Sequence, residues 1–365
     1  MKTHHIAFIA GLSLTLLSTH ALASQSSEAK ADFSKAYQTY LSAVKTNQNV
    51  KQAAERAYML GQNVYAKSSD NIANLAINYA KALENPAYKN VEIRYNLYKK
   101  AYVILVKNHG DESPNTIDAL LGIAKNTQLD KEAAKYLTRV VDIAQAQNMP
   151  KFVADMKFTA ASILSQKFVS NYYHKAKNYL IEADEYYQAN LPENSLERIK
   201  SDFLMASFAQ GSHKYDEAIE RLNRIVTVFD NSLNYDHSAE LSAHSKLIEL
   251  YEQQGKSEQA TKHCIAIAKM VPWKESQEQK PLYRVNPKYP ANKIYQSRDG
   301  SVQMEFEVDT AGFVKDIRVL DSIGGVTFEK EAMAAVKKWR YAPKFENGKP
   351  VVATSQVQLD FKIKH

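Results

Sequence analysis

The feature that most constrains the fold of this chain is a helical pattern that repeats about every 42 residues. The segments "YHKAKNYLIEADEYY", "YDEAIERLNRIVTVF" and "SEQATKHCIAIAKMVP" share apolar offsets, and their leading alanines Ala176, Ala218 and Ala260 are each 42 residues apart. A weaker copy begins at Ala133. Each unit needs two antiparallel helices, and the small leading residue lets them approach closely. The pattern predicts an all-helical array of five or six repeats. An irregular helical bundle remains the alternative.

These segments resemble the tetratricopeptide repeat family, which has small residues where its second helix packs on its first. The resemblance covers residues 24–272 and implies a solenoid of helix pairs. Such solenoids present a concave surface that usually binds a peptide or another protein. We therefore expect the helical repeats to be a protein-binding region.

The N-terminus has the pattern of an export signal. Lys2 is followed by an apolar run from Ile6 to Leu17, and Ala21-Leu22-Ala23 has the small-x-small form of a cleavage site. Twelve apolar residues make a helix of about 18 Å, which is short for a hydrocarbon core of about 30 Å. The sequence predicts a signal peptide over residues 1–23 and a periplasmic product. An uncleaved anchor, which would leave the chain at the inner membrane, is the alternative.

Cysteine content and charge narrow the possible partners. The chain has one cysteine, Cys264, so it forms no internal disulfide, and the apolar helical pattern around Cys264 predicts a packed side chain. Residues 280–365 hold 15 Lys/Arg and 10 Asp/Glu, which accounts for +5 of the formal net charge of +7. For an exported chain this basic region favours acidic protein segments or cell-wall polymers over nucleic acid as partners.

The composition changes after Pro272. Residues 273–290 are polar and rich in proline, which predicts an extended linker that ends in a Tyr-Pro motif. "SVQMEFEVD" and "FVKDIRVLDS" alternate as strands around the turn "DTAG", "TFEKEAMAAVKKW" returns to helical spacing, and "SQVQLDFKIKH" alternates again. Residues 291–365 therefore predict a three-stranded antiparallel sheet with one helix across its apolar face. The whole chain is predicted to be an α+β multidomain protein that starts with an all-α region.

The stretch "KKWRYAPKFENGKP" leaves this helix with two aromatic side chains around an arginine. We expect Trp339 to extend the buried stripe of the helix and Tyr341 to cover the sheet edge. Pro343 prevents continuation of the helix. Asn347-Gly348 is predicted to turn the chain into the last strand. A small domain with one helix on a three-stranded sheet needs this additional buried apolar surface, and we expect it to fold without the repeats.

Residues 281–365 are similar to the C-terminal domain of the TonB family, the periplasmic energy transducers of Gram-negative bacteria. The similarity lies in Tyr289-Pro290, "GSVQMEFEVDTAGFVKDIRVLDS", "FEKEAMAAVKKWRYAP" and "NGKPV". The residues that carry this structural signature are Gly300, Gly312, Phe328, Trp339, Arg340, Tyr341, Pro343 and Gly348.

The resemblance implies that the domain binds the TonB box, an N-terminal segment of outer-membrane receptors that transport iron–siderophore complexes and similar cargo. In that family the box adds as a strand to the exposed last strand, and the region around the Tyr-Pro motif contacts the receptor plug. Family members often carry glutamine where this chain has Lys288. The partner-binding residues implied here are Asn286, Lys288, Tyr289, Pro290, Ser355, Gln356, Gln358, Asp360, Lys362 and Lys364.

Two function classes follow from these features. In the first, the chain is a periplasmic component of a TonB-type energy-transducing transport system, and its repeats bind another member, such as an ExbB–ExbD-type motor or an associated protein. In the second, it is a periplasmic adaptor or scaffold whose C-terminal domain binds another peptide or the cell wall without energy coupling. An enzyme is not expected, nor a cofactor or metal: His237, Glu240 and His244 lack the spacing of a zinc-protease helix.

Overall fold

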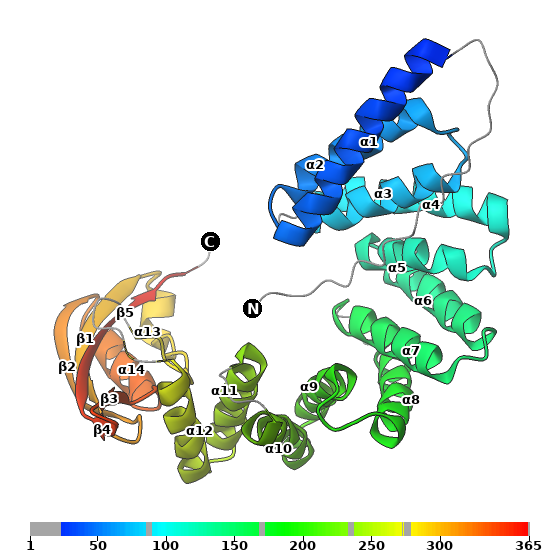
Figure 1. The fold of residues 1–365 in the computed structure, drawn as a ribbon. Helices are drawn as coiled ribbons and strands as arrows, with labels where there is room; N and C mark the ends of the chain where they lie inside the picture. Colours follow the sequence, from blue (N-terminus) through cyan, green and yellow to red (C-terminus); the bar gives the residue numbers. More distant parts are fainter. Residues whose placement is uncertain are drawn as a thin grey trace. The chain divides into compact units, whose positions relative to one another are not determined.

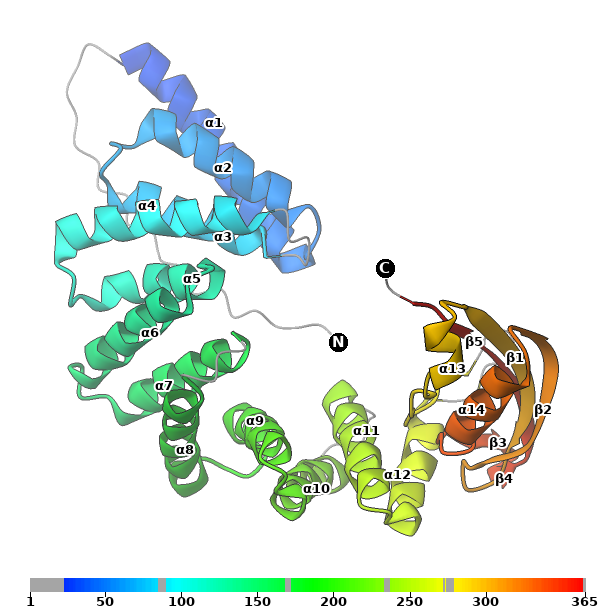
Figure 2. The ribbon, with the colours of Figure 1, turned by 180° about the vertical axis from the view of Figure 1, so that it is seen from behind.

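The computed structural model describes residues 23–84, 90–167, 172–232, 237–271, 273 and 279–363. The chain divides into two compact units, which we call the N-terminal unit (residues 2–191) and the C-terminal unit (residues 192–365). Figures 1 and 2 show the elements of each unit from two sides.

The N-terminal unit consists of antiparallel helix pairs, in which the second helix of one pair also packs on the first helix of the next. Its helices are α1 (Ala23–Thr46), α2 (Val50–Val64), α3 (Asp70–Ala82), α4 (Val91–His109), α5 (Ile117–Asn126), α6 (Asp130–Gln145), α7 (Pro150–Ser165) and α8 (Tyr173–Asn190). A 3-10 turn, η2 (Pro114–Thr116), leads into α5.

The C-terminal unit starts with two further helix pairs and ends in a mixed domain. Its elements are α9 (Leu196–Gly211), α10 (Tyr215–Ser232), α11 (Ser238–Gln253), α12 (Ser257–Met270), α13 (Ala291–Tyr295), β1 (Gly300–Val308), β2 (Val314–Ile323), α14 (Val326–Val336), β3 (Lys344–Glu346), β4 (Lys349–Val351) and β5 (Ala353–Phe361).

The leading alanines of the sequence repeat lie where the two helices of a pair meet. Ala133, Ala176, Ala218 and Ala260 are at most 1% exposed and lie near the start of α6, α8, α10 and α12, the second helix of each pair. The described residues contain six such pairs, the upper of the two predicted counts. The predicted helical-repeat architecture is confirmed.

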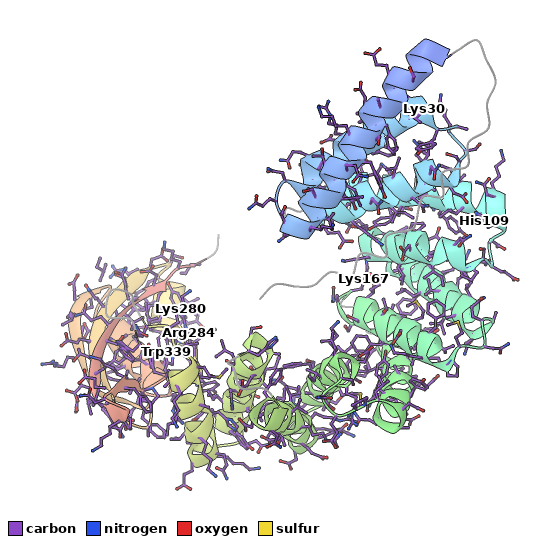
Figure 3. The ribbon with its side chains drawn as sticks, viewed as in Figure 1. Lys30, His109, Lys167, Lys280, Arg284 and Trp339 are labelled. Atoms are coloured by element: carbon purple, nitrogen blue, oxygen red, sulfur yellow. The ribbon has the colours of Figure 1, made fainter. Side chains whose placement is uncertain are left out.

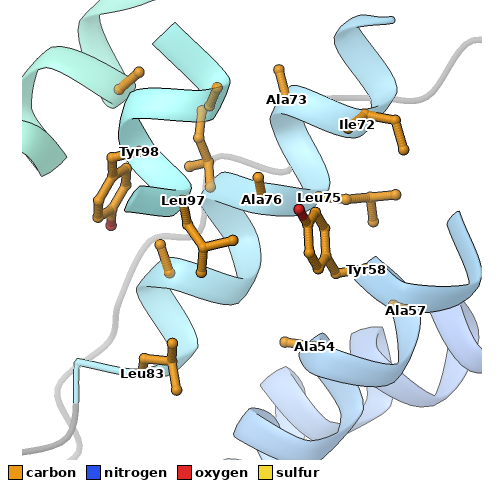
Figure 4. Packing of buried hydrophobic residues seen from close by; sticks show 14 of the residues in the cluster. Ala54, Ala57, Tyr58, Ile72, Ala73, Leu75, Ala76, Leu83, Leu97 and Tyr98 are labelled. Carbon is orange, nitrogen blue, oxygen red and sulfur yellow. The ribbon is translucent and has the colours of Figure 1, made fainter. Parts of the chain in front are cut away.

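Polar contacts between neighbouring pairs follow the same period. Lys100 Nζ donates to Tyr58 OH at 2.8 Å, across 42 residues, and Lys125 Nζ lies 2.9 Å from a Glu84 carboxylate oxygen, across 41 residues. Apolar packing follows it too: the side chains of α2, α3 and α4 form one continuous core, in which Tyr58, Leu75 and Tyr98 are buried (Figure 4). Successive pairs therefore repeat the same contacts.

The C-terminal part folds as the alternating pattern predicts. The sheet has the order β2-β1-β5, with both pairings antiparallel, and its inner face carries Val302, Met304 and Phe306 of the central strand. Helix α14 contributes Phe328 and Val336 to the same core. Strand alternation and helical spacing thus bring one apolar surface from each element into contact.

Three details differ from the sequence prediction. Asn347 and Gly348 have φ angles of 49° and 76°, and they turn β3 into β4 as a separate two-stranded hairpin before β5 begins. Tyr341 packs on Phe306 of the central strand, with ring centroids 5.5 Å apart, so it covers the face of the sheet rather than its edge. The short helix α13 was not anticipated.

The predicted change of domain at residues 272/273 lies between α12, which ends at Met270, and the elements of the sheet domain. Across that point, Ile248, Cys264 and Ile267 of the last helix pair share a cluster with Leu282 and Tyr283. This contact explains why α9–α12 belong to the same compact unit as the sheet.

Candidate partner-binding site

Strand β5 is an edge strand, because within the described residues it pairs only with β1. Two hydrogen bonds define its open side. Asp309 N–H donates to Phe313 O, toward β2, and Ile363 N–H donates to Asp299 Oδ1, toward the start of β1. Since backbone groups alternate sides along a strand, the odd-numbered residues of β5 direct N–H and C=O toward β1. The even-numbered residues direct theirs to the open edge: Thr354, Gln356, Gln358 and Asp360.

The side chains of β5 alternate between the core and solvent. Gln356, Gln358, Asp360 and Lys362 are exposed, as predicted. Ser355 is only 8% exposed and lies on the inner face of β5, so its side chain does not reach the solvent-facing side of the strand. The sequence already indicated this inward position, because Ser355 is an even number of residues away from the inward-facing Val357, Leu359 and Phe361. Lys364 lies outside the described residues.

The Tyr-Pro motif lies at the end of β5 and is largely structural. The Tyr289 ring packs edge-on against Phe328 and Phe361, with centroids 5.6 and 5.8 Å apart, and Tyr289 OH donates to Arg298 O at 2.8 Å. Pro290 is buried, whereas Asn286 and Lys288 are exposed. Tyr289 and Pro290 therefore attach this segment to the domain core. Of the four predicted partner-binding residues in the segment, Asn286 and Lys288 have side chains exposed to solvent.

Trp339 fixes the extended segment that leads to this motif. Its side chain is 1% exposed, its Nε1–H donates to Val285 O at 2.8 Å, and the Arg284 guanidinium lies 5.0 Å from the ring centroid (Figure 3). The predicted burial of Trp339 is confirmed. Because Val285 directly precedes Asn286, this contact also positions the exposed part of the candidate site.

Two glycines of the predicted signature are required by their surroundings. A Cβ on Gly300 would lie 2.6 Å from the Phe328 ring. Gly312 has a φ of 83°, and a Cβ there would lie 2.2 Å from Tyr341 O. The first glycine lets α14 approach β1, and the second lets the β1–β2 turn approach the chain after Trp339.

His237, Glu240 and His244 do not form a site together. His237 Nδ1 accepts the Ala239 N–H at the start of α11, while His244 is buried and its Nδ1 lies 2.8 Å from His263 Nδ1. In the part of the chain that the structure describes, no three His, Cys, Asp or Glu side chains are grouped so that they could hold a metal ion.

None of the described helices combines the length and apolar character needed to cross a membrane.

Comparison with known families supports the predicted resemblance of the C-terminal part. Residues 285–363 match the family profile of the Gram-negative bacterial TonB protein C-terminal. Protein TonB of Pseudomonas aeruginosa is 33% identical over 84 residues, which is 23% of this chain and 25% of that protein. Protein TonB of Salmonella typhimurium is 38% identical over 69 residues, 19% of this chain and 27% of that protein. The chain thus spans about a quarter of the length of these curated relatives.

Solved structures resemble the two parts of the chain separately. The solution structure of the Pseudomonas aeruginosa TonB C-terminal domain is 31% identical and covers 25% of this chain and 92% of its own, with a TM-score of 0.22. A Podosopora anserina putative kinesin light chain with nearly identical TPR-like repeats is 18% identical, covering 54% of this chain and 92% of its own, with a TM-score of 0.45.

Proposed function

Because residues 285–363 match the TonB C-terminal domain, we propose that this chain is a periplasmic component of a TonB-type transport system. In this proposal the C-terminal domain binds N-terminal segments of outer-membrane receptors, such as those for iron chelates. The helical repeats bind another protein of the system. The role is one of binding, without catalysis or a cofactor. The structural observation that supports it best is the open edge of β5, whose Phe361 packs against Tyr289 of the Tyr-Pro motif.

Strand addition suits this edge physically. An extended receptor segment would form backbone hydrogen bonds with the even-numbered residues of β5, and such bonds give affinity with little demand on the sequence of the partner. Open strand edges are prone to aggregation unless charged side chains protect them. The exposed Asp360 and Lys362 supply such charges at this edge.

Replacing Gln358 by proline tests the proposal directly. The Gln358 N–H points to the open edge, so Gln358→Pro removes a donor that a receptor strand would use while leaving the β1–β5 hydrogen bonds in place. We expect a synthetic receptor N-terminal peptide to bind this variant at least about tenfold more weakly than the wild type, because a hydrogen bond is lost and the proline ring occupies the edge.

Gln358→Ala is the matched control, because it removes the same side chain and keeps the N–H. Gln356→Pro provides a second edge position with the same geometry and should weaken binding to a similar degree. Each variant is first checked for a native amide spectrum. Equal peptide affinity of folded Gln358→Pro and Gln358→Ala would rule out strand addition at β5.

A cellular measurement separates energy-coupled transport from an adaptor role. We expect deletion of the gene to lower the uptake of iron chelates that depends on the proton-motive force. Unchanged uptake, together with retained binding of the receptor peptide, would favour the adaptor.

A further inference from the structure

The last helix pair has an apolar surface that the C-terminal domain covers. Ile248 on α11 and Ala260, Cys264 and Ile267 on α12 are at most 3% exposed. The residues that pack on them from outside the pair include Leu282, Tyr283 and Ala342. A terminal repeat of a helical array needs such a cover, since no following repeat buries its apolar face.

Arg340 connects the two sides of this contact through its side chain. The guanidinium is 1% exposed, and Nη1 forms an ion pair with the Glu252 carboxylate at the end of α11. Nη1 also donates to Ser257 O at 3.3 Å, and Nη2 donates to Thr261 Oγ1 on α12 at 2.8 Å. Ser257 Oγ donates to the second Glu252 oxygen at 2.8 Å, so the carboxylate is held in place from α12 as well.

The same arginine is bonded to its own domain. Nη2 donates to Ala311 O in the β1–β2 turn at 2.9 Å, and the guanidinium carbon lies 3.8 Å from the centroid of the Phe313 ring. The Arg340 backbone forms antiparallel bridges with both Tyr283 and Phe313. A single buried residue therefore joins three parts of the unit. Its side chain bonds to the helix pair and to the β1–β2 turn, and its backbone bonds to Tyr283 in the linker.

A buried ion pair of this kind specifies geometry more than it adds stability, because the cost of desolvating both charges offsets most of their attraction. Moving the domain away from this position, without full separation, would leave the Glu252 carboxylate or the Arg340 guanidinium buried without its partner. Misaligned arrangements are thus strongly disfavoured.

We infer that the α11–α12 surface is the docking site of this chain's own C-terminal domain, which caps the helix pair in solution in a position fixed by Arg340 and Glu252. That surface is consequently not available to an outside partner of the repeats. The docked position also prevents the edge of β5, which we propose as the receptor-binding site, from reorienting freely relative to the helix pair.

The only cysteine of the chain provides a native probe of this docking. A Cβ built on Gly312 lies 3.6 Å from Cys264 Cβ, so the β1–β2 turn covers this part of α12. In the full chain we expect Cys264 to react slowly with an aromatic disulfide reagent. Arg340→Met should raise the rate by about 100-fold or more, because removing one member of a buried pair leaves an uncompensated charge and favours undocking. Glu252→Gln should raise the rate as well, with less change in shape.

Arg318→Met is the matched control, since Arg318 pairs with Glu305 on the same sheet but its side chain is 72% exposed. In Arg318→Met, Cys264 should react with the disulfide reagent at the same rate as in the wild type. Amide hydrogen exchange of α12 is measured in parallel, because undocking exposes the thiol while the helix keeps its own hydrogen bonds. The inference fails if Cys264 already reacts rapidly in the wild type or if its rate is unchanged in folded Arg340→Met. It also fails if Arg340→Met makes the α12 amides exchange faster in parallel with the faster reaction of Cys264, because that would indicate unfolding of the helix rather than undocking.

Discussion

At the scale of single residues, Trp339 contributes both to the core and to the position of the candidate site. Its indole lies in the cluster that contains Phe306 and Val336, and its Nε1–H is bonded to Val285 O. The Arg284 guanidinium carbon lies over the ring, 5.0 Å from its centroid. Loss of this side chain would therefore affect the domain core and the segment before Asn286 together.

We predict that Trp339→Ala lowers the free energy of unfolding by about 3–5 kcal/mol, the usual cost of removing a large buried aromatic side chain. Trp339→Phe should cost less, because it keeps most of the apolar surface and loses the hydrogen bond to Val285. Denaturant unfolding of the two variants measures the difference. A cost below about 1 kcal/mol for Trp339→Ala would contradict the burial seen here.

The His244–His263 pair predicts a dependence of stability on pH. Burial lowers the pKa of both imidazoles, and burial together with the neighbouring His244 and Lys262 lowers the pKa of His263 from 6.5 to about 4. At pH values between about 4 and 6.5, His263 is protonated in the unfolded state but not in the folded state. The stability of the folded state therefore falls as the pH decreases through this range. For His263 alone the loss is at most about 3 kcal/mol.

Tryptophan fluorescence can follow this effect, because Trp273 and Trp339 are the two tryptophans of the chain and both belong to the C-terminal unit. Denaturant unfolding at about pH 7 and about pH 5 should show a smaller pH dependence in His263→Gln than in the wild type. The prediction is wrong if the two proteins lose the same stability over this range.

At the scale of elements, close packing of helices depends on small residues at the contact. Gly122 on α5 faces Tyr98 on α4, and a Cβ at Gly122 would lie 2.2 Å from the Tyr98 ring, which is itself 1% exposed. At this distance either the buried ring or the two helices would have to shift. Leading alanines such as Ala176 and Ala260 serve the other contacts in the same way.

We predict that Gly122→Ala destabilises the chain by up to about 2 kcal/mol, because an overpacking cost of about 1–3 kcal/mol is offset by a gain of about 1 kcal/mol in helix propensity. Gly211→Ala is the control. Gly211 is also helical, but a Cβ there meets nothing within 4 Å, so this change should be neutral or stabilising. Thermal unfolding followed by circular dichroism compares the two, and equal effects would contradict the packing argument.

At the scale of the whole molecule, the division into residues 2–191 and 192–365 separates α1–α8 from a unit in which two helix pairs and the sheet are packed together. The sheet has its own core around Phe306, Phe328 and Trp339, whereas the contact with α12 adds the Arg340 network. The two sources of stability predict different behaviour for different fragments.

We expect residues 281–365 to fold alone and to unfold at a lower denaturant concentration than the fragment 192–365. The shorter fragment retains the sheet core but loses the contacts that α11 and α12 make with Arg340. Amide spectra and denaturant midpoints of both fragments measure this. Identical midpoints would mean that docking adds no stability to the domain, and an undispersed spectrum of residues 281–365 would mean that the domain requires the helices.

Local patterns in the sequence determined much of this fold. The 42-residue period identified the second helix of several pairs, and apolar alternation identified β1, β2 and β5, together with the inward residues of β1. The turn at Gly312 was predicted correctly as well, because glycine is favoured where φ is positive. These features follow from backbone preferences and from the placement of apolar side chains along one element, so a short window of sequence contains them.

Only the tertiary structure decided which elements meet. It packed Tyr289 against the core, put the Asn-Gly turn in a separate hairpin, and paired Arg340 with Glu252, 88 residues earlier in the chain. Nothing in "WRYAP" distinguishes an arginine that faces solvent from one that is buried between a sheet and a helix pair. Charge pairing across such a distance depends on which surfaces become buried together, and that is settled by the packing of the whole unit rather than by local preference.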